Sequence, residues 1–106
     1  MFGLGKKFDA QEITKEIQQG SAILVDVRGG AEWQGGHAKD AIHISVDRIM
    51  GGDLPTKDKA KKIYLYCASG GRASTAAQYL KGRGYTVENL GGLSSWKSAG
   101  GAVELG

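Results

Sequence analysis

The only cysteine of this 106-residue chain is followed by a loop of small residues and then by an arginine. Cys67 ends a run of apolar and aromatic residues (62–67), and the sequence continues as Ala68-Ser69-Gly70-Gly71-Arg72 before a segment with helical periodicity. Small residues allow a backbone to curl tightly and to turn its N–H groups inward. The beginning of a helix adds the positive end of its dipole, and Arg72 adds a fixed positive charge. We therefore expect the thiolate of Cys67, the nucleophilic form, to be favoured.

A plainer interpretation of Cys67 has to be weighed against this one. A lone cysteine at a strand end is more often a small buried apolar residue than a nucleophile. A glycine pair after a strand is also common as a simple turn. The complete order of strand, cysteine, small-residue loop, arginine and helix start favours the functional interpretation, because each part would stabilise an anion at the same point.

The elements around Cys67 must place it at one edge of a sheet. Apolar runs predict strands at 22–27, 41–46, 62–67 and 85–90. Helices are predicted from a cap at Asp9 to Gly20, over 72–82 and over 93–97, and a single helical turn near Glu32. Residues 51–61 are predicted to be a connector, and residues 6–8 are too short a run to assign. This alternation predicts an α/β fold of three layers, in which a mostly parallel sheet of four to five strands has helices on both faces. Ligands bind beyond the carboxyl ends of such strands, where Cys67 stands.

Composition excludes several classes of function. One cysteine rules out an internal disulfide, and with two histidines it is too little for a metal site, so neither metal nor cofactor is expected. No segment has the length of a membrane span or the pattern of a secretory signal, which predicts a cytoplasmic protein without membrane contact. A net charge of +3 is a mild bias toward anionic partners, and nucleic acid is not an expected one.

The loop after Cys67 resembles the active-site loop of the rhodanese superfamily. The resemblance covers residues 8–98, the expected core of a single domain 1–106 with short flexible ends. The further motifs are D-x-R at 26–28, E-aromatic at 32–33, G-H at 36–37, A-I-x-I at 41–44, G-Y at 84–85, the glycine pair at 91–92 and Trp96. Two departures are a spacing one residue shorter than the usual L-x-G-G and the absence of the proline and second glycine from G-H-I-P-G-A.

Loop length distinguishes activities within that superfamily. Sulfurtransferases have a six-residue loop counted from the cysteine, whereas the related cell-cycle phosphatases have seven residues ending in arginine. The stretch from Cys67 to Arg72 is six residues long. The resemblance therefore implies a small, single-domain thiosulfate sulfurtransferase and disfavours a phosphatase or an arsenate reductase.

The resemblance also implies roles for individual residues. Cys67 would take a sulfur atom from a donor such as thiosulfate, hold it as a persulfide and pass it to an external thiol, a partner protein or cyanide. The substrate-binding set would be Ala68, Ser69, Gly70, Gly71, Arg72 and Ala73, mainly through backbone N–H groups. Arg72 would bind the anion and close the loop. Asp26, Arg28 and Glu32 would form an acid–base pairing that fixes the loops around the site.

Two alternatives remain open, namely a relay that passes persulfide to one partner and a non-enzymatic rhodanese-like interaction module. His37 and His43 are expected to make structural hydrogen bonds, because a low-pKa thiolate needs no general base. Trp33 and Trp96 are expected to pack in the core or at its rim.

Overall fold

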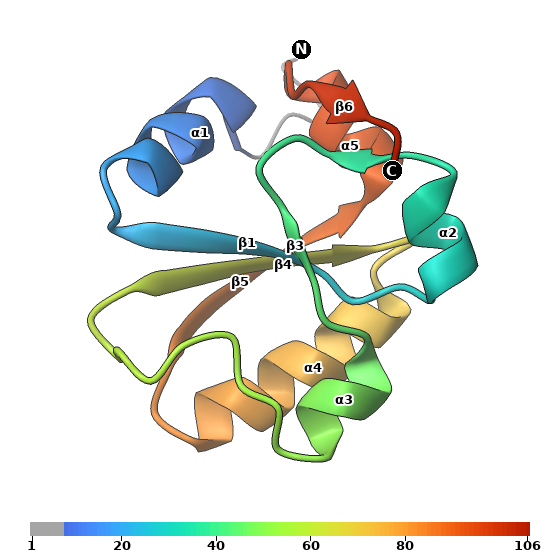
Figure 1. The fold of residues 1–106 in the computed structure, drawn as a ribbon. Helices are drawn as coiled ribbons and strands as arrows, with labels where there is room; N and C mark the ends of the chain where they lie inside the picture. The colour runs from blue at the N-terminus through green and yellow to red at the C-terminus, as the bar shows by residue number, and fades with distance from the viewer. Residues whose placement is uncertain (1–7) are drawn as a thin grey trace, which may run out of the picture.

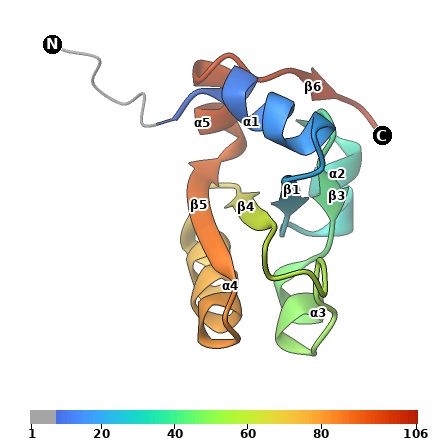
Figure 2. The same cartoon turned by 90° about the vertical axis from the view of Figure 1, so that its left-hand side faces the viewer.

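The computed structural model describes residues 8–106, which form a three-layer α/β fold (Figures 1 and 2). The strands are β1 Ala22–Asp26, β2 His37–Ala38, β3 Ile42–His43, β4 Lys62–Cys67, β5 Thr86–Gly92 and β6 Val103–Glu104. The helices are α1 Ala10–Gln18, α2 Gly30–Gln34, α3 Val46–Met50, α4 Gly71–Gly82 and α5 Leu93–Ser98. The run at 6–8, which the sequence analysis leaves unassigned, lies mostly outside the described residues.

The central sheet has four parallel strands in the order β3-β1-β4-β5. Strand β4 lies inside it, with Ile63 opposite Ile23 of β1 and opposite Val87 of β5. Five of its six residues are buried, as the uninterrupted apolar run predicts for a strand covered on both faces. The predicted α/β class and parallel sheet are confirmed, and the strand that ends at Cys67 is an inner one.

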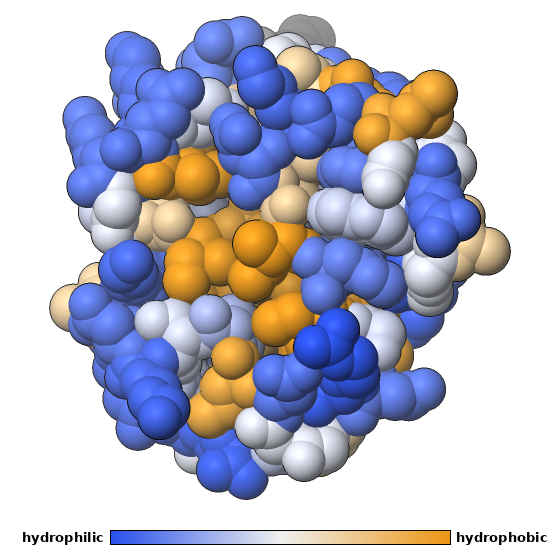
Figure 3. Space-filling view, in the orientation of Figure 1, coloured by the Kyte–Doolittle hydropathy of each residue, from blue (hydrophilic) through white to orange (hydrophobic). Residues whose placement is uncertain are grey.

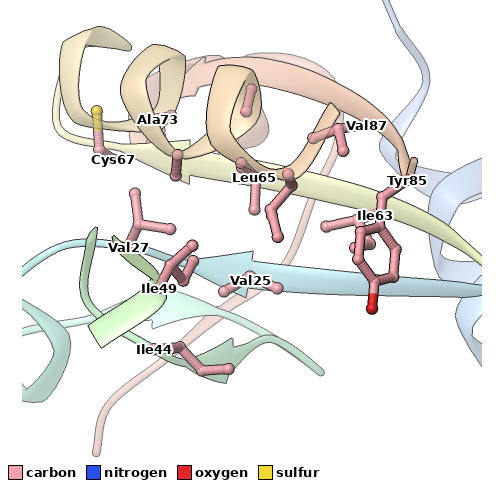
Figure 4. Packing of buried hydrophobic residues seen from close by; sticks show 13 residues of the cluster. Val25, Val27, Ile44, Ile49, Ile63, Leu65, Cys67, Ala73, Tyr85 and Val87 are labelled. Carbon is pink, nitrogen blue, oxygen red and sulfur yellow. The ribbon is translucent and has the colours of Figure 1, made fainter. Parts of the chain in front are cut away.

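Helices cover both faces of this sheet (Figure 1). Helices α3 and α4 pack below it in that view, and Figure 4 shows the apolar side chains that fill the space between them and the strands. Helix α4 turns Ala73, Ala76, Ala77 and Leu80 toward the sheet, and these small side chains let the helix lie close to β4. Helices α1 and α5 cover the opposite face, where Trp96 and Tyr66 are the largest buried side chains.

The first helix begins and ends where its sequence predicts. A side-chain oxygen of Asp9 accepts the backbone N–H of Gln11 at 2.9 Å, which satisfies one of the free donors of the first turn. Ile13 is buried and Ile17 lies half-buried on the same side. Gly20 follows with φ +80°, a left-handed conformation that glycine adopts without steric cost.

The segment 41–46 differs from its prediction. Only Ile42–His43 form a strand, and Val46–Met50 form helix α3. The sequence analysis placed Val46 in a strand and left 47–50 unassigned. Val46 and Ile49 stand three residues apart and both face the core, where Ile49 is fully buried. A helix of one turn contains too few apolar positions to show its period, so the β-branched residues alone favoured a strand.

The C-terminal end contains a short strand, β6, that the sequence analysis does not predict. Val103 and Ala38 pair across the antiparallel strands β6 and β2. The indole N–H of Trp96 donates to the carbonyl oxygen of Ala102 at 2.8 Å, and Gly101 lies directly on the Trp96 ring. Two-residue strands carry no alternation that a sequence pattern can reveal.

The surface of the described residues combines charged side chains with a few apolar ones. Ile42, Met50, Val103 and Leu105 are the large apolar residues that are exposed. Figure 3 shows apolar residues gathered across the middle of the face on which β3 is the nearest strand in Figure 1. No helix within residues 8–106 is long and apolar enough to cross a membrane.

Candidate active site

Cys67 is the last residue of β4 and lies beneath an exposed loop. Its residue surface is 1% exposed, whereas Ala68 and Ser69 immediately after it are exposed. Figure 4 shows its sulfur pointing toward the beginning of α4. In the sheet register Cys67 is opposite Gly92, so the loop after β4 and the end of β5 meet at this carboxyl edge.

The backbone of the loop points at the sulfur. The N–H of Gly70 donates to Sγ of Cys67 at 2.9 Å. Gly70 has φ +105° and ψ −15°, and it occupies the position before the first turn of the twelve-residue helix α4. A residue with a Cβ rarely adopts this φ, so glycine is what allows the chain to reverse here and to turn its N–H inward.

These N–H groups change the acidity of the thiol. Burial raises the pKa of Cys67, but the backbone N–H groups of Ala73, Ser69, Gly70 and Arg72 lower it more, and the resulting pKa is below the ordinary value. Hydrogen bonds to the charged form outweigh desolvation because several donors converge on one atom. The structure thus brings together the loop residues that the sequence grouped around Cys67.

The glycine pair of β5 makes room for this loop. A Cβ on Gly92 would collide with the carbonyl oxygen of Ala68, so the loop backbone lies directly on Gly92. Leu65 pairs with Asn89 but Cys67 pairs with Gly92, which means that β5 contains one extra residue and bulges. Gly91 within the bulge has φ +93°. The bulge lies at the L-G-G motif (90–92), whose spacing differs from the usual L-x-G-G.

Arg72 at the end of the loop pairs with a carboxylate. Its two terminal nitrogens donate to Oε1 and Oε2 of Glu32 at 2.7 and 2.9 Å. The guanidinium, with a further hydrogen bond from the N–H of Gly29, lowers the pKa of Glu32 to about 2, and Glu32 in turn raises the pKa of Arg72. Glu32 therefore links the loop after Cys67 to the beginning of α2.

Asp26 and Arg28 form a separate, buried ion pair. Arg28 Nη2 lies 2.7 Å from Asp26 Oδ2 and also donates to the carbonyl oxygen of Gly36 at 2.6 Å. The Asp26 carboxylate raises the pKa of Arg28 despite its burial. The sequence analysis grouped Asp26, Arg28 and Glu32 in one acid–base pairing. In the structure Asp26 and Arg28 form one ion pair, and Glu32 forms another with Arg72.

Tyr66 completes this buried network and was missed by the sequence analysis. Its hydroxyl donates to Asp26 Oδ2 at 2.7 Å and accepts the backbone N–H of Ala38 at 2.9 Å. Burial and the neighbouring carboxylate raise the pKa of Tyr66. An aromatic residue in a strand is most simply an apolar core residue, and the available signal was its place one residue before Cys67 on an inner strand.

The two histidines make structural contacts. His37 Nδ1 lies 3.0 Å from the carbonyl oxygen of Trp33, and its ring stacks on the Trp33 ring with 3.5 Å between centroids. His43 Nε2 lies 2.7 Å from the carbonyl oxygen of Arg28. These are the hydrogen-bonding roles expected for the two residues. Among residues 8–106, no three potential metal-ligating side chains come together.

The known family of rhodanese-like domains matches residues 9–99 of the chain. The protein belongs to this family. Among curated relatives of the rhodanese domain, an uncharacterized protein of Synechocystis sp. is 40% identical over 87 residues, covering 78% of this chain and 47% of that protein. A tRNA uridine(34) hydroxylase of Hamiltonella defensa is 35% identical over 86 residues, covering 76% of this chain and 24% of the hydroxylase. The chain thus spans less than half the length of either relative.

Solved structures share the same rhodanese fold. A rhodanese with anions from E. coli superimposes with a TM-score of 0.67 at 27% identity, covering 80% of this chain and 99% of that one. A protein from Bacillus halodurans gives a TM-score of 0.74 at 28% identity, covering 96% of this chain and 78% of that chain. These likenesses agree with the family match and extend over at least four-fifths of the chain.

An open pocket of about 440 Å³ lies beside this loop in the rhodanese domain. It is lined by Phe8, Ser69, Gly70, Glu88, Asn89, Leu90, Gly91 and Ser95. Cys67 itself is not among the lining residues. The pocket is bordered by the loop after Cys67 and by the bulge of β5 on which the loop rests.

Proposed function

We propose that this rhodanese domain is a thiosulfate-type sulfurtransferase that moves a sulfane sulfur to a thiol or cyanide acceptor through a persulfide on Cys67. The observation that carries the proposal is the Gly70 N–H aimed at Sγ from 2.9 Å. A donor in this position stabilises negative charge on the sulfur before, during and after attack, with little reorganisation of the loop. The six-residue loop offers room for one added sulfur atom.

In the loading step the Cys67 thiolate attacks the outer sulfur of thiosulfate. The new bond joins Sγ to that sulfur, the sulfur–sulfur bond of thiosulfate breaks, and sulfite leaves with the electron pair. The persulfide carries one negative charge, which the N–H groups that surround the thiol, those of Ser69, Gly70, Arg72 and Ala73, would share. Splitting the transfer in two in this way is nucleophilic covalent catalysis.

In the unloading step an external nucleophile attacks the outer persulfide sulfur. A thiolate acceptor leaves as a persulfide and cyanide leaves as thiocyanate, and in both cases the electron pair of the broken bond returns to Sγ. Cys67 is the one cysteine of the chain, so no second thiol of the same chain can accept the sulfur. The acceptor therefore lies outside these 106 residues.

Arg72 has an indirect role in this proposal. Its guanidinium is engaged by Glu32 in two hydrogen bonds, and the pair neutralises most of the charge that Arg72 would offer to a donor. Thiosulfate is then held mainly by backbone N–H groups and the beginning of α4, as anions often are at helix N-termini. Arg72 closes the loop by tying it to α2.

A persulfide relay to one partner protein is the second candidate. The 1% exposure of Cys67 favours it, because a bulky acceptor reaches the sulfur only if the loop presents the persulfide outward or the partner moves the loop. Such a relay would load from thiosulfate but turn over slowly with small acceptors.

Steady-state turnover separates these candidates. The wild-type chain is incubated with thiosulfate and cyanide, and sulfite and thiocyanate are measured together, with Cys67→Ser as the matched control. Equal amounts of both products from the wild type alone support the sulfurtransferase. One equivalent of sulfite without thiocyanate favours the relay, and no product at all from folded, reduced protein overturns the proposal in favour of the interaction module.

A further inference from the structure

Asn89 makes two hydrogen bonds that join the loop after Cys67 to the bulge of β5. Its side-chain nitrogen Nδ2 donates to the carbonyl oxygen of Gly70 at 3.0 Å. Its Oδ1 accepts the backbone N–H of Gly91, two residues further along, at 2.8 Å. The bond to Gly91 fixes which way the amide points, so the donor faces the loop before any ligand is bound.

The residue that Asn89 contacts is the one that donates to the sulfur. The Gly70 N–H lies 2.9 Å from Sγ, while the Gly70 carbonyl oxygen accepts both the N–H of Ser74 at 2.8 Å and Asn89 Nδ2. The contact with Ser74 belongs to the first turn of α4. Within the described residues, the other side chains that hydrogen-bond the backbone of 68–71 are Cys67 itself and Thr75 of α4, whose hydroxyl donates to the carbonyl oxygen of Gly71. Asn89 is the side chain that reaches this backbone from β5.

Gly70 needs such support because its own chain restrains it weakly. Glycine populates left- and right-handed conformations about equally, so a glycine at φ +105° loses more conformational freedom than other residues when it is held in place. A Cβ built on Gly70 would lie 3.5 Å from Gly91 Cα, so the two glycines are neighbours across the loop and the bulge. Asn89 bonds to both of them and holds them in this relation.

We propose that Asn89 is a positioning residue for Cys67, which holds Gly70 so that its N–H stays directed at the sulfur. The inference deepens the proposed function, on which its catalytic meaning rests, but its geometric claim concerns the thiolate alone. The hydrogen bonds of the Asn89 side chain go to Gly70 and Gly91, and neither goes to Sγ. It acts through Gly70 and stabilises the thiolate and the persulfide by the same hydrogen bond.

The test is the pH profile of alkylation of Cys67 by iodoacetamide, which requires no sulfur donor. Asn89→Ala removes both hydrogen bonds without adding charge, and we expect the apparent pKa of Cys67 to rise by about half a unit to one unit. Asn89→Leu removes the same two hydrogen bonds with an uncharged side chain of similar size, and its shift should be of the same sign and size. Thr86→Ala, exposed at the other end of β5, is the matched control and should titrate as the wild type does.

Asn89 is exposed, so both variants are expected to fold, which far-ultraviolet circular dichroism verifies. An unchanged alkylation pKa in folded Asn89→Ala would overturn the proposal, even if the wild type turns over thiosulfate. Failure of the wild type to load sulfur would instead overturn the proposed function, while a raised pKa in the variants would still establish Asn89 as a positioning residue. If Asn89→Ala unfolds, the uncharged Asn89→Leu decides by the same measurement, and unfolding of both would contradict a role limited to the loop.

Discussion

Gly70 donates its backbone N–H to Sγ of Cys67 at 2.9 Å from a left-handed conformation, φ +105°, that favours glycine. The carbonyl group of the same residue begins the hydrogen-bond pattern of α4 by accepting from Ser74. One glycine thus ends the loop, starts the helix and binds the sulfur. The chemistry of Cys67 depends on backbone conformation at this point more than on any neighbouring side chain.

The first prediction concerns the pH at which Cys67 becomes reactive. Its pKa in the folded protein is lowered, so the thiolate fraction at neutral pH should exceed that of an ordinary cysteine, whose pKa is about 8.5. Alkylation rates measured against pH should give a midpoint below that of the same chain unfolded in urea. Because the folded pKa is the lower one, the thiolate adds stability above the unfolded pKa and loses it as pH falls through the folded pKa. A folded midpoint at or above the unfolded one would contradict the geometry.

Gly70→Ala should both destabilise the fold and slow sulfur loading. A left-handed conformation costs a residue with a Cβ about 1–2 kcal/mol, and relaxation of that strain would rotate the N–H away from Sγ. The free energy of unfolding in urea and the rate of alkylation at neutral pH should both decrease. Gly82→Ala is the matched control, because a Cβ there meets no atom and Gly82 lies within a helix, where alanine is favoured. If Gly70→Ala is as stable and as reactive as Gly82→Ala, the left-handed conformation of Gly70 is not what directs its N–H at the sulfur.

Glu32→Gln should reveal the ion pair with Arg72 through the pH dependence of stability. Arg72, with help from the Gly29 N–H, lowers the pKa of Glu32 from 4.5 to about 2. The carboxylate therefore contributes stability above the unfolded pKa, and this contribution is lost as pH falls toward 2. Both side chains are about two-fifths exposed, so solvent screens the pair and the loss should stay below about 1 kcal/mol at neutral pH. Urea titrations of wild type and variant should converge near pH 2, and a difference that does not narrow there would exclude the pairing in solution.

Tyr66→Phe should lower the free energy of unfolding more than Tyr64→Phe does. The Tyr66 hydroxyl joins buried Asp26 to the N–H of Ala38, and its loss leaves a buried donor unpaired, at about 1–3 kcal/mol. The Tyr64 hydroxyl donates to Glu16 nearer the surface at 2.6 Å, where water can replace it. The free energies of unfolding of the two variants are compared with that of the wild type. Equal losses would contradict a larger contribution from the buried hydrogen bonds around Asp26.

Much of the fold and the centre of the site follow from local patterns. The apolar run that ends at Cys67 predicts an inner strand, and the small residues after it predict the tight loop, because both signals lie within a dozen consecutive residues. The alanines of α4 recur at helical spacing and mark its buried face. Asp9 and Gly20 mark the ends of a helix by their own conformational preferences.

The parts that escape prediction depend on contacts between distant segments. Asn89 hydrogen-bonds Gly70, nineteen residues away in the sequence, at the bulge of β5. No pattern in the residues next to Asn89 predicts this contact. The Tyr66 hydroxyl hydrogen-bonds Asp26 of the neighbouring strand, a contact that the apolar pattern of β4 does not reveal. The pairing of β2 with β6 involves two residues on each side, which is too short to leave a pattern.

The central claim is that Cys67 carries the transferred sulfur, and intact mass after treatment with thiosulfate tests it most directly. The wild-type chain should gain the mass of a single sulfur atom and lose it again when a thiol or cyanide is added, while Cys67→Ser should gain nothing. Folded, reduced wild-type protein that gains no sulfur, or a Cys67→Ser variant that gains as much as the wild type, would contradict the account.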